Sequence, residues 1–423
     1  MSQLQEQDRA RLAEWIGKRR IGFSLPADFF TTAEAYRADE QIFRRNWIYA
    51  GATAELAEPG SFFTLTVFGD PIVVLRSLDG SIRAFHNVCR HHGAKICLEE
   101  RGQARRLRCT YHHWSYHLDG SLAVARGMPA GFDGAEYPLK QVAVEIVQGM
   151  IFICLAQDPP DISDFRAAAS PYLAPHAAGR TKVAHRSTII ERANWKLVIE
   201  NNRECYHCPG NHPEFLTASY DVTLPGDTRV DQAFAANLAS HQAEWDAMEL
   251  AHLDAGGGIH YRCIRLPLKP GFHSFTLDGE PGCRKLLGDL ATPRLGSLRM
   301  FRPPNSWNHY LADHIINFRV IPLSPNETAV QTIWLVHEDA EEGVDYDVER
   351  LTKVWIKTND QDRRLVEMNQ EAIASSAYEP GPQSEEEFLV ADFQDWYFAE
   401  LAAIVDCPPA QSAGTKLGLA EPR

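Results

Sequence analysis

Two short cysteine–histidine pairs constrain the fold of this chain more strongly than any other feature. Cys89 and His91 form the first pair, and Cys109 and His112 form the second. Each pair follows a run of residues that is typical of a strand, so the sequence predicts two loops that share one metal centre. Two thiolates and two imidazoles are sufficient to hold a tetrahedral zinc ion or a [2Fe–2S] cluster.

The residues around these pairs carry repeated hairpin signals. Asp-Gly or Gln-Gly dipeptides separate short apolar runs, and such a dipeptide between two runs favours a two-residue turn. We therefore predict a small antiparallel β domain over residues 46–158, which ends in a Pro- and Asp-rich stretch. The three predicted hairpins join 72–76 to 81–85, 116–118 to 121–124, and 144–147 to 150–155.

The spacing within the pairs favours an iron–sulfur cluster over zinc. A single residue separates Cys89 from His91, whereas the spacers of zinc fingers are usually about two to four residues long. The pattern fits a Rieske centre, in which two histidines replace two cysteines on one iron. His92 and His113 lie next to the proposed ligands. They do not keep the spacing, so we expect them to face solvent or to support the ligands.

A second candidate metal site lies in the stretch ENNRECYHCPGNH. Glu204 and His207 are three residues apart, which places them on one face of a predicted helix. The Pro209-Gly210 pair is expected to end that helix, and His212 can then fold back beside His207. Two imidazoles with a carboxylate suit a ferrous ion that keeps positions open for oxygen.

The third ligand of this second metal is expected to be a carboxylate that is distant in sequence. An amphipathic helix predicted over 344–377 carries an apolar stripe that includes Trp355 and Leu365. Asp362 falls on this stripe, whereas Asp360 falls among charged residues on the polar face. A charge on an apolar face needs a partner, and a metal ion is one. Asp362 is therefore the predicted ligand, with a helix cap or a salt bridge as the alternative.

The rest of the chain indicates a mixed arrangement of helices and an antiparallel sheet. Residues 1–45 are polar and helical in pattern, and we expect them to form an arm that packs on the larger part, residues 159–423. Within that part we expect a helix over 194–208 and two strands at 315–321 and 329–335. The predicted fold class is α+β, in which helices flank the antiparallel sheet of the larger part.

Charge and composition exclude several classes of partner. The net charge of −14 argues against nucleic acid or an anionic membrane as the main partner. No apolar run approaches the roughly 18 residues of a membrane span, and the N-terminus lacks an apolar signal core. We therefore expect a cytoplasmic protein. Its nine cysteines are an odd number, which suits reduced thiols and metal ligands better than a disulfide framework.

Several motifs together resemble those of one enzyme family. The stretches CRHHGA, CTYHHWSY, NWKLVIENNRECYH and NDQDRRLVEMNQ resemble the oxygenase (alpha) component of the Rieske non-haem iron oxygenases. The resemblance covers almost the whole chain, including WLVHEDAEEGVDYDVERL and FQDWY. Within the family, the chain is most similar to the glycine betaine monooxygenases. Most ring-hydroxylating relatives have Asp where Glu204 stands, and Glu is typical of the branch that acts on quaternary ammonium compounds.

The resemblance implies a monooxygenase with two iron cofactors. A Rieske [2Fe–2S] cluster on the two Cys-His pairs would receive electrons from NAD(P)H through a separate flavin and iron–sulfur reductase. A mononuclear Fe(II) in the catalytic domain, held by His207, His212 and Asp362, would bind O2. The implied reaction is N-demethylation of glycine betaine to dimethylglycine and formaldehyde.

The resemblance also implies an assembly. In this family the chains pack head to tail as a homotrimer, so that the cluster of one chain faces the iron of its neighbour. Glu204 would then connect His112 of one chain to His207 of the next and carry electrons and protons between subunits. A surface glutamate without a function is the alternative.

The substrate pocket is the least defined part of this prediction. A trimethylammonium group donates no strong hydrogen bond and is held by aromatic faces. Trp307, His309 and Tyr310 are the most suggestive candidates, followed by Trp334 and Tyr220, and core packing is the alternative for each. Other possible substrates are proline betaine, carnitine and choline. A different class of function is a Rieske electron carrier fused to a ligand-binding domain without catalytic activity.

Overall fold

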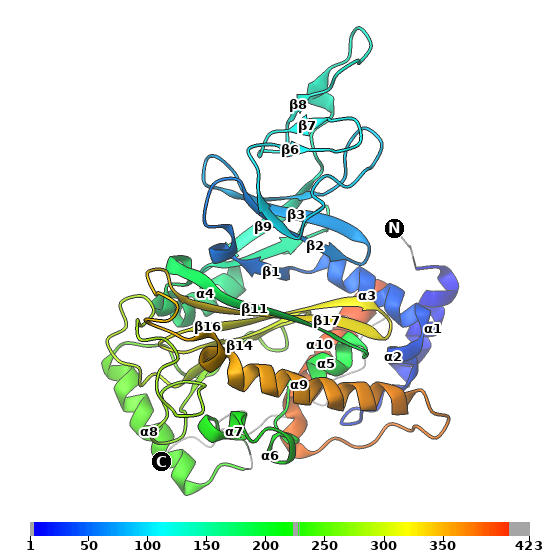
Figure 1. Ribbon diagram of the computed structural model, residues 1–423. Coiled ribbons are helices and arrows are strands. Elements are labelled where there is room, and N and C mark those ends of the chain that lie inside the picture. The colour runs from blue at the N-terminus through cyan, green and yellow to red at the C-terminus, as the bar shows by residue number, and fades with distance from the viewer. Residues whose placement is uncertain (1–3, 223–226, 228, 406–423) are drawn as a thin grey trace.

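The computed structural model describes residues 4–222, 227 and 229–405 of the 423-residue chain. Two large antiparallel sheets lie one above the other in Figure 1, with helices packed around the lower sheet. The α+β fold class predicted from the sequence is confirmed. The predicted C-terminal tail after Cys407 lies outside the described residues. Over the described part of the chain, no helix is long and apolar enough to cross a membrane.

The upper sheet has the strand order β1-β10-β9-β4-β3-β2-β5. All three predicted hairpins are present as paired strands. Gln148 (φ +46°) and Gly149 (φ +83°) form the turn between β9 and β10, and two successive positive φ angles match the twist of the strands that they join. The strands are β1 (Ile48–Ala52), β2 (Ser61–Val67), β3 (Asp70–Arg76), β4 (Ile82–His86), β5 (Arg101–Gln103), β9 (Gln141–Val147) and β10 (Met150–Cys154).

A three-stranded sheet, β6-β7-β8, projects from the upper sheet and forms the tip of the molecule in Figure 1. It packs with neighbouring loops and with side chains of β2, β3 and β4 around a shared core, in which Trp114, Tyr116 and Leu107 are buried. This core lets short strands hold two loops rigidly. The strands are β6 (Leu107–Arg108), β7 (Ser115–Tyr116) and β8 (Leu122–Val124).

The lower sheet has the order β11-β17-β16-β15-β14-β13-β12 and forms the floor of the larger part. The two strands predicted at 315–321 and 329–335 are confirmed as parts of the long strands β16 and β17, which Pro325-Asn326 joins in a turn. Asn305 connects the two sheets, since its side chain accepts from the N–H of Tyr49 at 2.8 Å and donates to the carbonyl of Tyr49 at 3.0 Å. The strands are β11 (Thr181–Glu191), β12 (Ala255–Gly256), β13 (Arg262–Leu266), β14 (Ser297–Arg302), β15 (Ser306–Tyr310), β16 (Ile315–Ser324) and β17 (Glu327–His337).

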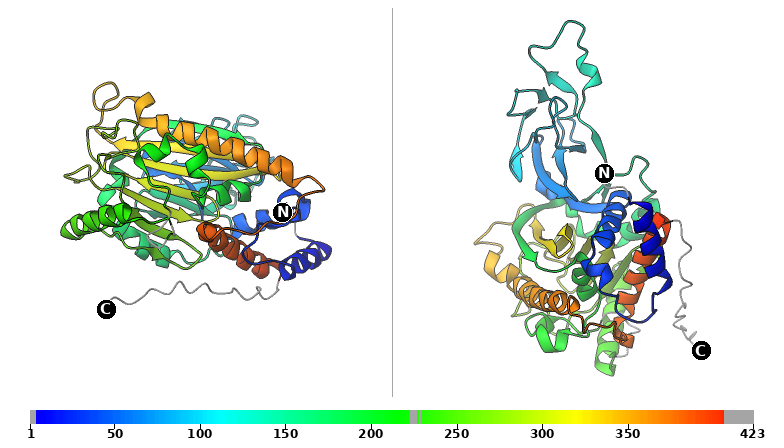
Figure 2. Two further views of the ribbon diagram at one scale, coloured as in Figure 1. Left: turned by 90° about the horizontal axis from the view of Figure 1, so that it is seen from below. Right: turned by 90° about the vertical axis from the view of Figure 1, so that its right-hand side faces the viewer.

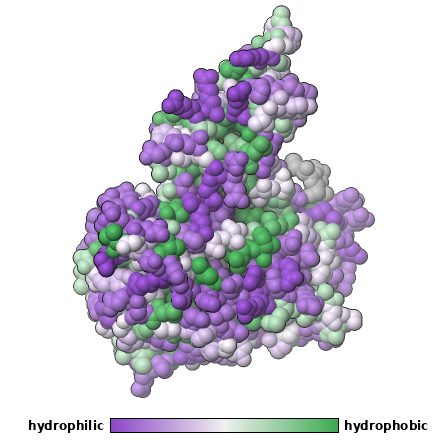
Figure 3. All heavy atoms as spheres, in the orientation of Figure 1, coloured by the Kyte–Doolittle hydropathy of each residue, from purple (hydrophilic) through white to green (hydrophobic). Residues whose placement is uncertain are grey.

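The long helix α9 runs across the lower sheet, and the N-terminal helices pack beside α10 at its edge (Figure 2). Hydrophilic side chains predominate on the face shown in Figure 3, with apolar ones gathered below the junction of the two sheets. The helices are α1 (Glu6–Gly17), α2 (Asp28–Thr31), α3 (Ala33–Arg45), α4 (Ser163–Leu173), α5 (Trp195–Asn202), α6 (Cys208–Asn211), α7 (Phe215–Ala218), α8 (Gln232–Ala247), α9 (Val348–Ile373) and α10 (Phe388–Val405). Short 3-10 turns are η1 (Thr53–Leu56), η2 (Gly134–Glu136), η3 (Ala174–His176), η4 (Ala178–Arg180) and η5 (Glu385–Glu387).

Helix α5 is anchored by a buried ion pair. The Nζ atom of Lys196 lies 2.6 Å from Asp39 of α3, and the hydroxyl of Tyr397 in α10 donates to the same carboxylate at 2.9 Å. Asn194 caps the helix by accepting from the N–H of Lys196 at 3.0 Å. Helices α3 and α10 therefore fix the direction of α5, whose C-terminal end leads into the second candidate metal site.

Candidate active site

The two predicted cluster loops lie together beside the β6-β7-β8 sheet. Cys89 and Cys109 are buried at the base of the loops. The rings of His91 and His112 stand 4.7 Å apart between centroids, and His91 stacks on Trp114 at the same centroid distance. The four predicted ligands thus come from two adjacent loops, with sulfur inside and imidazole towards the surface.

The pKa of the Cys109 thiol is raised overall, because burial outweighs the donors around the sulfur. Burial raises the pKa of the Cys109 thiol, backbone N–H groups of Tyr111 and His112 act to lower this pKa, and the neighbouring Cys89 raises it. The hydroxyl of Tyr116 lies 3.4 Å from the Cys89 sulfur. Donors aimed at sulfur stabilise thiolates and tune the potential of an iron–sulfur cluster. These observations fit a [2Fe–2S] centre.

His92 and His113 occupy different positions around this centre. His92 lies close enough to His91 and His112 for the three to form a possible metal-binding group. His113 has a positive φ of +61°, the backbone conformation that Gly93 adopts in the first loop with φ +78°. The two loops therefore turn back in the same way, which explains the similar placement of their ligands.

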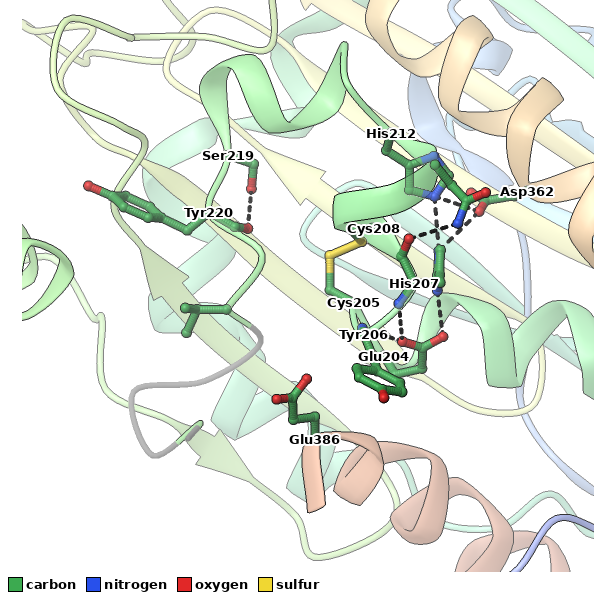
Figure 4. Close-up of a disulfide and its surroundings, with 12 residues drawn as sticks. Glu204, Cys205, Tyr206, His207, Cys208, His212, Ser219, Tyr220, Asp362 and Glu386 are labelled. Atoms are coloured by element: carbon green, nitrogen blue, oxygen red, sulfur yellow. Dashed lines mark hydrogen bonds and ion pairs between the residues drawn. A yellow bond between two sulfur atoms is a disulfide. The ribbon is translucent and has the colours of Figure 1, made fainter. Parts of the chain in front are cut away.

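The second site brings together His207, His212 and Asp362, the three residues predicted for the mononuclear metal (Figure 4). The two Nε2 atoms are 2.9 Å apart. The Oδ1 atom of Asp362 lies 3.3 Å from Nε2 of His207 and 2.9 Å from Nε2 of His212. Three potential ligand atoms therefore converge on one point from the two residues that flank α6 and from α9.

The other ring nitrogen of each histidine is held by an acceptor. Nδ1 of His207 donates to Glu204 at 2.5 Å, and Nδ1 of His212 donates to the side-chain oxygen of Gln361 at 2.9 Å. These bonds place the proton of each neutral ring on Nδ1 and aim the Nε2 lone pairs inward. Two lone pairs and a carboxylate then face one another without a donor, so the arrangement requires a cation.

The protonation of the second site reflects this concentration of acceptors. Burial lowers the pKa of His207, but hydrogen bonds to Asp362 and Glu204 overcome it and raise the pKa to about 9. The pKa of His212 is also raised, by Asp362 and Gln361 against burial. Burial raises the pKa of Asp362, but both histidines overcome this and lower it. A proton takes the position of the cation when no metal is bound.

The local structure differs from the predicted helix over 194–208. Helix α5 ends at Asn202, and Glu204 lies in the following loop, where it accepts the backbone N–H groups of Tyr206 and His207. The prediction that Pro209-Gly210 ends a helix is also wrong. This pair lies inside the short helix α6, which begins at Cys208. Proline lacks an N–H group and is favoured in the first turn of a helix, where that group has no partner.

A disulfide joins Cys205 to Cys208 on either side of Tyr206 and His207 (Figure 4). The expectation that all cysteines are reduced is therefore wrong at this pair. The turn brings their Cα atoms to 4.9 Å, within the range of disulfides. The number of cysteines in a sequence does not show that a turn brings two of them together. The six other described cysteines are free and buried.

A cavity of about 100 Å³ opens beside the second site. This volume is well above the roughly 10–15 Å³ that a cavity needs to hold one water molecule. Three of its lining residues are the predicted metal ligands. Its aromatic walls are Phe215, Phe301, Trp307, His309 and Trp355, and its cationic walls are Arg203, Arg262 and Arg299.

Two of the three leading substrate candidates line this cavity. Trp307 and His309 do so, whereas Tyr310 packs against His176 with ring centroids 5.4 Å apart. Successive side chains of a strand point to opposite faces, so Tyr310 of β15 cannot share the face of its neighbour. The cavity walls also do not include Trp334 or Tyr220.

The sequence does not indicate some residues of the site. The sequence predicts Trp355 on the apolar stripe of α9 and gives no sign that it lines the pocket. In the structure it lines the cavity, and its ring centroid lies 4.6 Å from that of His309. Gln361 directly precedes Asp362 and holds the ring of His212 by a hydrogen bond, a role that the sequence does not indicate. Its amide also donates to Glu214 at 2.8 Å. The sequence does not single out the three arginines, because Arg203 follows α5 whereas Arg262 and Arg299 lie on two strands, and only the folded chain places them together.

The two candidate metal sites lie at opposite ends of the folded molecule. The β6-β7-β8 sheet beside the cluster loops is at the top of Figure 1, and α6, which carries the second site, is at the bottom. The edge of each site is open to solvent, with Tyr111 next to His112 exposed by 64% and Tyr206 next to His207 by 59%. Contact between the two sites therefore requires a second chain.

Comparisons with known proteins agree with this arrangement. Residues 46–142 match the Rieske [2Fe-2S] domain, and residues 178–403 match the ring hydroxylating alpha subunit (catalytic domain). The chain is 47% identical to the glycine betaine monooxygenase oxygenase subunit of Pseudomonas aeruginosa over 395 residues, which cover 93% of this chain and 92% of that protein. It is 44% identical to the protein with the same description in Chromohalobacter salexigens, over 94% of this chain and 90% of that one.

A solved structure shares the fold. The quaternary ammonium Rieske monooxygenase CntA, in complex with an inhibitor, aligns with a TM-score of 0.70 at 21% identity. The alignment covers 95% of this chain and 99% of that one. The order of a cluster domain followed by a helix-flanked sheet is thus common to both.

Proposed function

This chain belongs to the Rieske non-haem iron oxygenases as an oxygenase (alpha) subunit, and on that premise we propose that it removes one methyl group from glycine betaine. The proposed overall reaction is glycine betaine + O2 + NAD(P)H + H⁺ → dimethylglycine + formaldehyde + NAD(P)⁺ + H2O. The observation that carries the proposal is the convergence of two imidazoles and one carboxylate at a small, aromatic-walled cavity. The identity of 47% to a betaine monooxygenase subunit supports the choice of substrate.

The family has two cofactors, and we propose which residues hold them here. Cys89, His91, Cys109 and His112 would hold the Rieske cluster, because their loops bring two thiols and two imidazoles together. His207, His212 and Asp362 would hold a mononuclear iron(II), because their ligand atoms face one another without a donor. When bound, the iron supplies a site at which O2 is activated by electrons from the cluster.

The residues of the chain have separate tasks in this reaction. Glu204 and Gln361 hold the Nδ1 protons of the two histidines and so keep both rings oriented. Trp307 and Trp355 present aromatic faces to the quaternary nitrogen, and together with the apolar lining they exclude water. Hydroxylation of one methyl carbon gives a hemiaminal that separates into formaldehyde and the tertiary amine.

We further propose a head-to-tail homotrimer in which Glu204 links two chains. In this chain one oxygen of Glu204 accepts from Nδ1 of His207. The second oxygen accepts the backbone N–H groups of Tyr206 and His207, so one of the roughly four lone-pair sites of the carboxylate, on the first oxygen, is left for His112 of a neighbouring chain. The placement of the two sites at opposite ends of one chain and the exposure of Tyr111 and Tyr206 support this proposal. A separate NAD(P)H-dependent reductase would supply electrons, and we propose a cytoplasmic location on that basis.

The substrate is tested with a panel of quaternary amines. The purified subunit is combined with a compatible reductase and incubated with glycine betaine, proline betaine, carnitine or choline, and products are identified by mass spectrometry. We expect dimethylglycine from glycine betaine at the highest kcat/KM. A higher value for another amine would transfer the proposal to that amine. Absence of demethylation in the whole panel, with both metals present, would favour an electron carrier without catalytic activity.

A further inference from the structure

We propose that Arg203 and Arg299 form a subsite for the carboxylate of the substrate, so that the cavity selects N-methylated amino acids over N-methylated alcohols. The proposal rests on the proposed function and specifies the part of the substrate that the iron site does not recognise.

The lower sheet places cationic and aromatic side chains on one face. In the pairing of β13, β14 and β15, Arg262 lies opposite Phe301, and Phe301 lies opposite Trp307. Two residues along, Arg299 lies opposite His309. Directly opposite residues of antiparallel strands, and alternate residues of one strand, project to the same side. Aromatic and guanidinium groups therefore form neighbouring parts of one cavity wall.

The three guanidinium groups of this cavity differ in their partners. Arg262 is balanced by two carboxylates, Asp392 at 3.2 Å and Asp254 at 3.6 Å. Within the part of the chain that the structure describes, neither Arg203 nor Arg299 forms an ion pair. Their Nε atoms are buried and have no hydrogen-bond partner among these residues. A buried charge without a partner is costly, so both groups favour an anion in the cavity.

Each of the two arginines is held in place by its neighbours. The guanidinium of Arg203 lies 3.9 Å above the ring centre of Phe301. The terminal nitrogens of Arg299 donate to the hydroxyl of Ser219 at 2.9 Å and to the carbonyl of Val222 at 3.2 Å. Both partners are uncharged, so they orient the guanidinium without neutralising it. A planar group fixed in this way is suited to a carboxylate.

Both arginines carry a charge at neutral pH. Burial and the nearby Arg262 lower the pKa of Arg203 to about 9, although Asp392 and Asp254 act to raise it, and burial lowers the pKa of Arg299 to about 10. The two positive charges repel a cationic ligand from their end of the cavity. Arg203 already covers one face of Phe301, which leaves Trp307 and Trp355 for the quaternary nitrogen. A zwitterion satisfies both regions at once, whereas choline satisfies only the aromatic one.

The test compares glycine betaine with choline, which has a hydroxyl in place of the carboxylate. Binding of both ligands is measured by calorimetry on the iron-loaded wild type, Arg203→Gln and Arg299→Gln, and kcat/KM is measured with the reductase. We expect each substitution to weaken betaine binding by roughly 10- to 100-fold, the effect of one charged hydrogen bond. Choline binding should change by less than about threefold, because it lacks the anion.

Two further variants control the comparison. Arg265→Gln removes another buried arginine of β13 that bonds His176 at 3.2 Å and does not line the cavity, and it should leave the betaine-to-choline ratio unchanged. Trp307→Leu should weaken the binding of betaine and the binding of choline by similar factors. The visible spectrum of the cluster and circular dichroism confirm folding of each variant.

The possible results separate the subsite from the proposed function. Equal effects of the arginine substitutions on betaine and choline, or no effect on either, would overturn the carboxylate subsite. If the wild type releases no formaldehyde from betaine, the proposed function fails, and the binding series still decides the subsite by itself.

Discussion

Binding of a metal ion to the iron-free second site is expected to release a proton from His207. The pKa of this residue is raised from 6.5 to about 9, which corresponds to an interaction of roughly 3 kcal/mol. The side chain is only 17% exposed, so solvent screens this interaction weakly. The Asp362 carboxylate has a lowered pKa and is already ionised, so it contributes no proton.

The sign of the pH dependence follows from the direction of the shift. A histidine whose pKa is raised on folding stabilises the iron-free protein fully below about pH 6.5, and this stabilisation is lost as the pH rises through about 9. Over the same range the metal no longer competes with a proton. The affinity for the metal should therefore rise by about tenfold per pH unit for each proton released.

The assay is calorimetric titration of the iron-free site with Co²⁺, which does not oxidise during the measurement. Titrations at about pH 7 in two buffers with different ionisation heats give the number of protons released. We expect at least one proton for the wild type and fewer for Glu204→Gln, because Glu204 is one of the groups that raise the pKa of His207. Identical heats in both buffers, together with an affinity that does not change between about pH 6.5 and 8, would refute this reasoning.

Three further predictions concern the ligand set, the link between subunits and the core. Asp362→Ala should lose the mononuclear iron and keep the cluster, so that metal analysis falls from about three to about two irons per chain while the cluster spectrum is retained; a loss of all iron would contradict it. Glu204→Gln should retain both metals and block turnover, so that the reduced cluster is not reoxidised when betaine and O2 are added; normal coupled activity would exclude the linking role. Lys196→Met should lower the free energy of unfolding by about 3–5 kcal/mol in denaturant titrations, because it leaves Asp39 charged and buried, and Lys196→Met combined with Asp39→Leu should recover part of this loss.

The convergence of the proposed metal ligands could be predicted from the sequence because these residues have fixed local spacing or fixed periodicity. The cysteine–histidine pairs lie in tight loops whose spacing limits the metal that they can hold. Asp362 could be chosen over Asp360 because α9 is long and amphipathic, and a carboxylate on its buried face needs a partner. The hairpins could be predicted because two-residue turns depend on the residues within them.

Features that depend on tertiary contacts could not be predicted in this way. The end of α5 at Asn202 depends on Glu204, which satisfies backbone N–H groups of the loop in place of a further helical turn. The sequence does not reveal which face of the sheet each residue of β15 occupies, so it predicts Tyr310 in the pocket. A shift of one position along a strand moves a side chain to the opposite face of the sheet. The arginines of the cavity come from the residue after α5 and from two strands, so only the folded chain brings them together.

The most direct test of the central claim is the stoichiometry of the reconstituted reaction. The wild-type subunit, a reductase, NADH and glycine betaine should give one formaldehyde and one dimethylglycine for each NADH that depends on substrate. Asp362→Ala should give neither product while its cluster still accepts electrons. NADH consumption by the wild type without formaldehyde, or formaldehyde release that persists in Asp362→Ala, would contradict demethylation at the site formed by His207, His212 and Asp362.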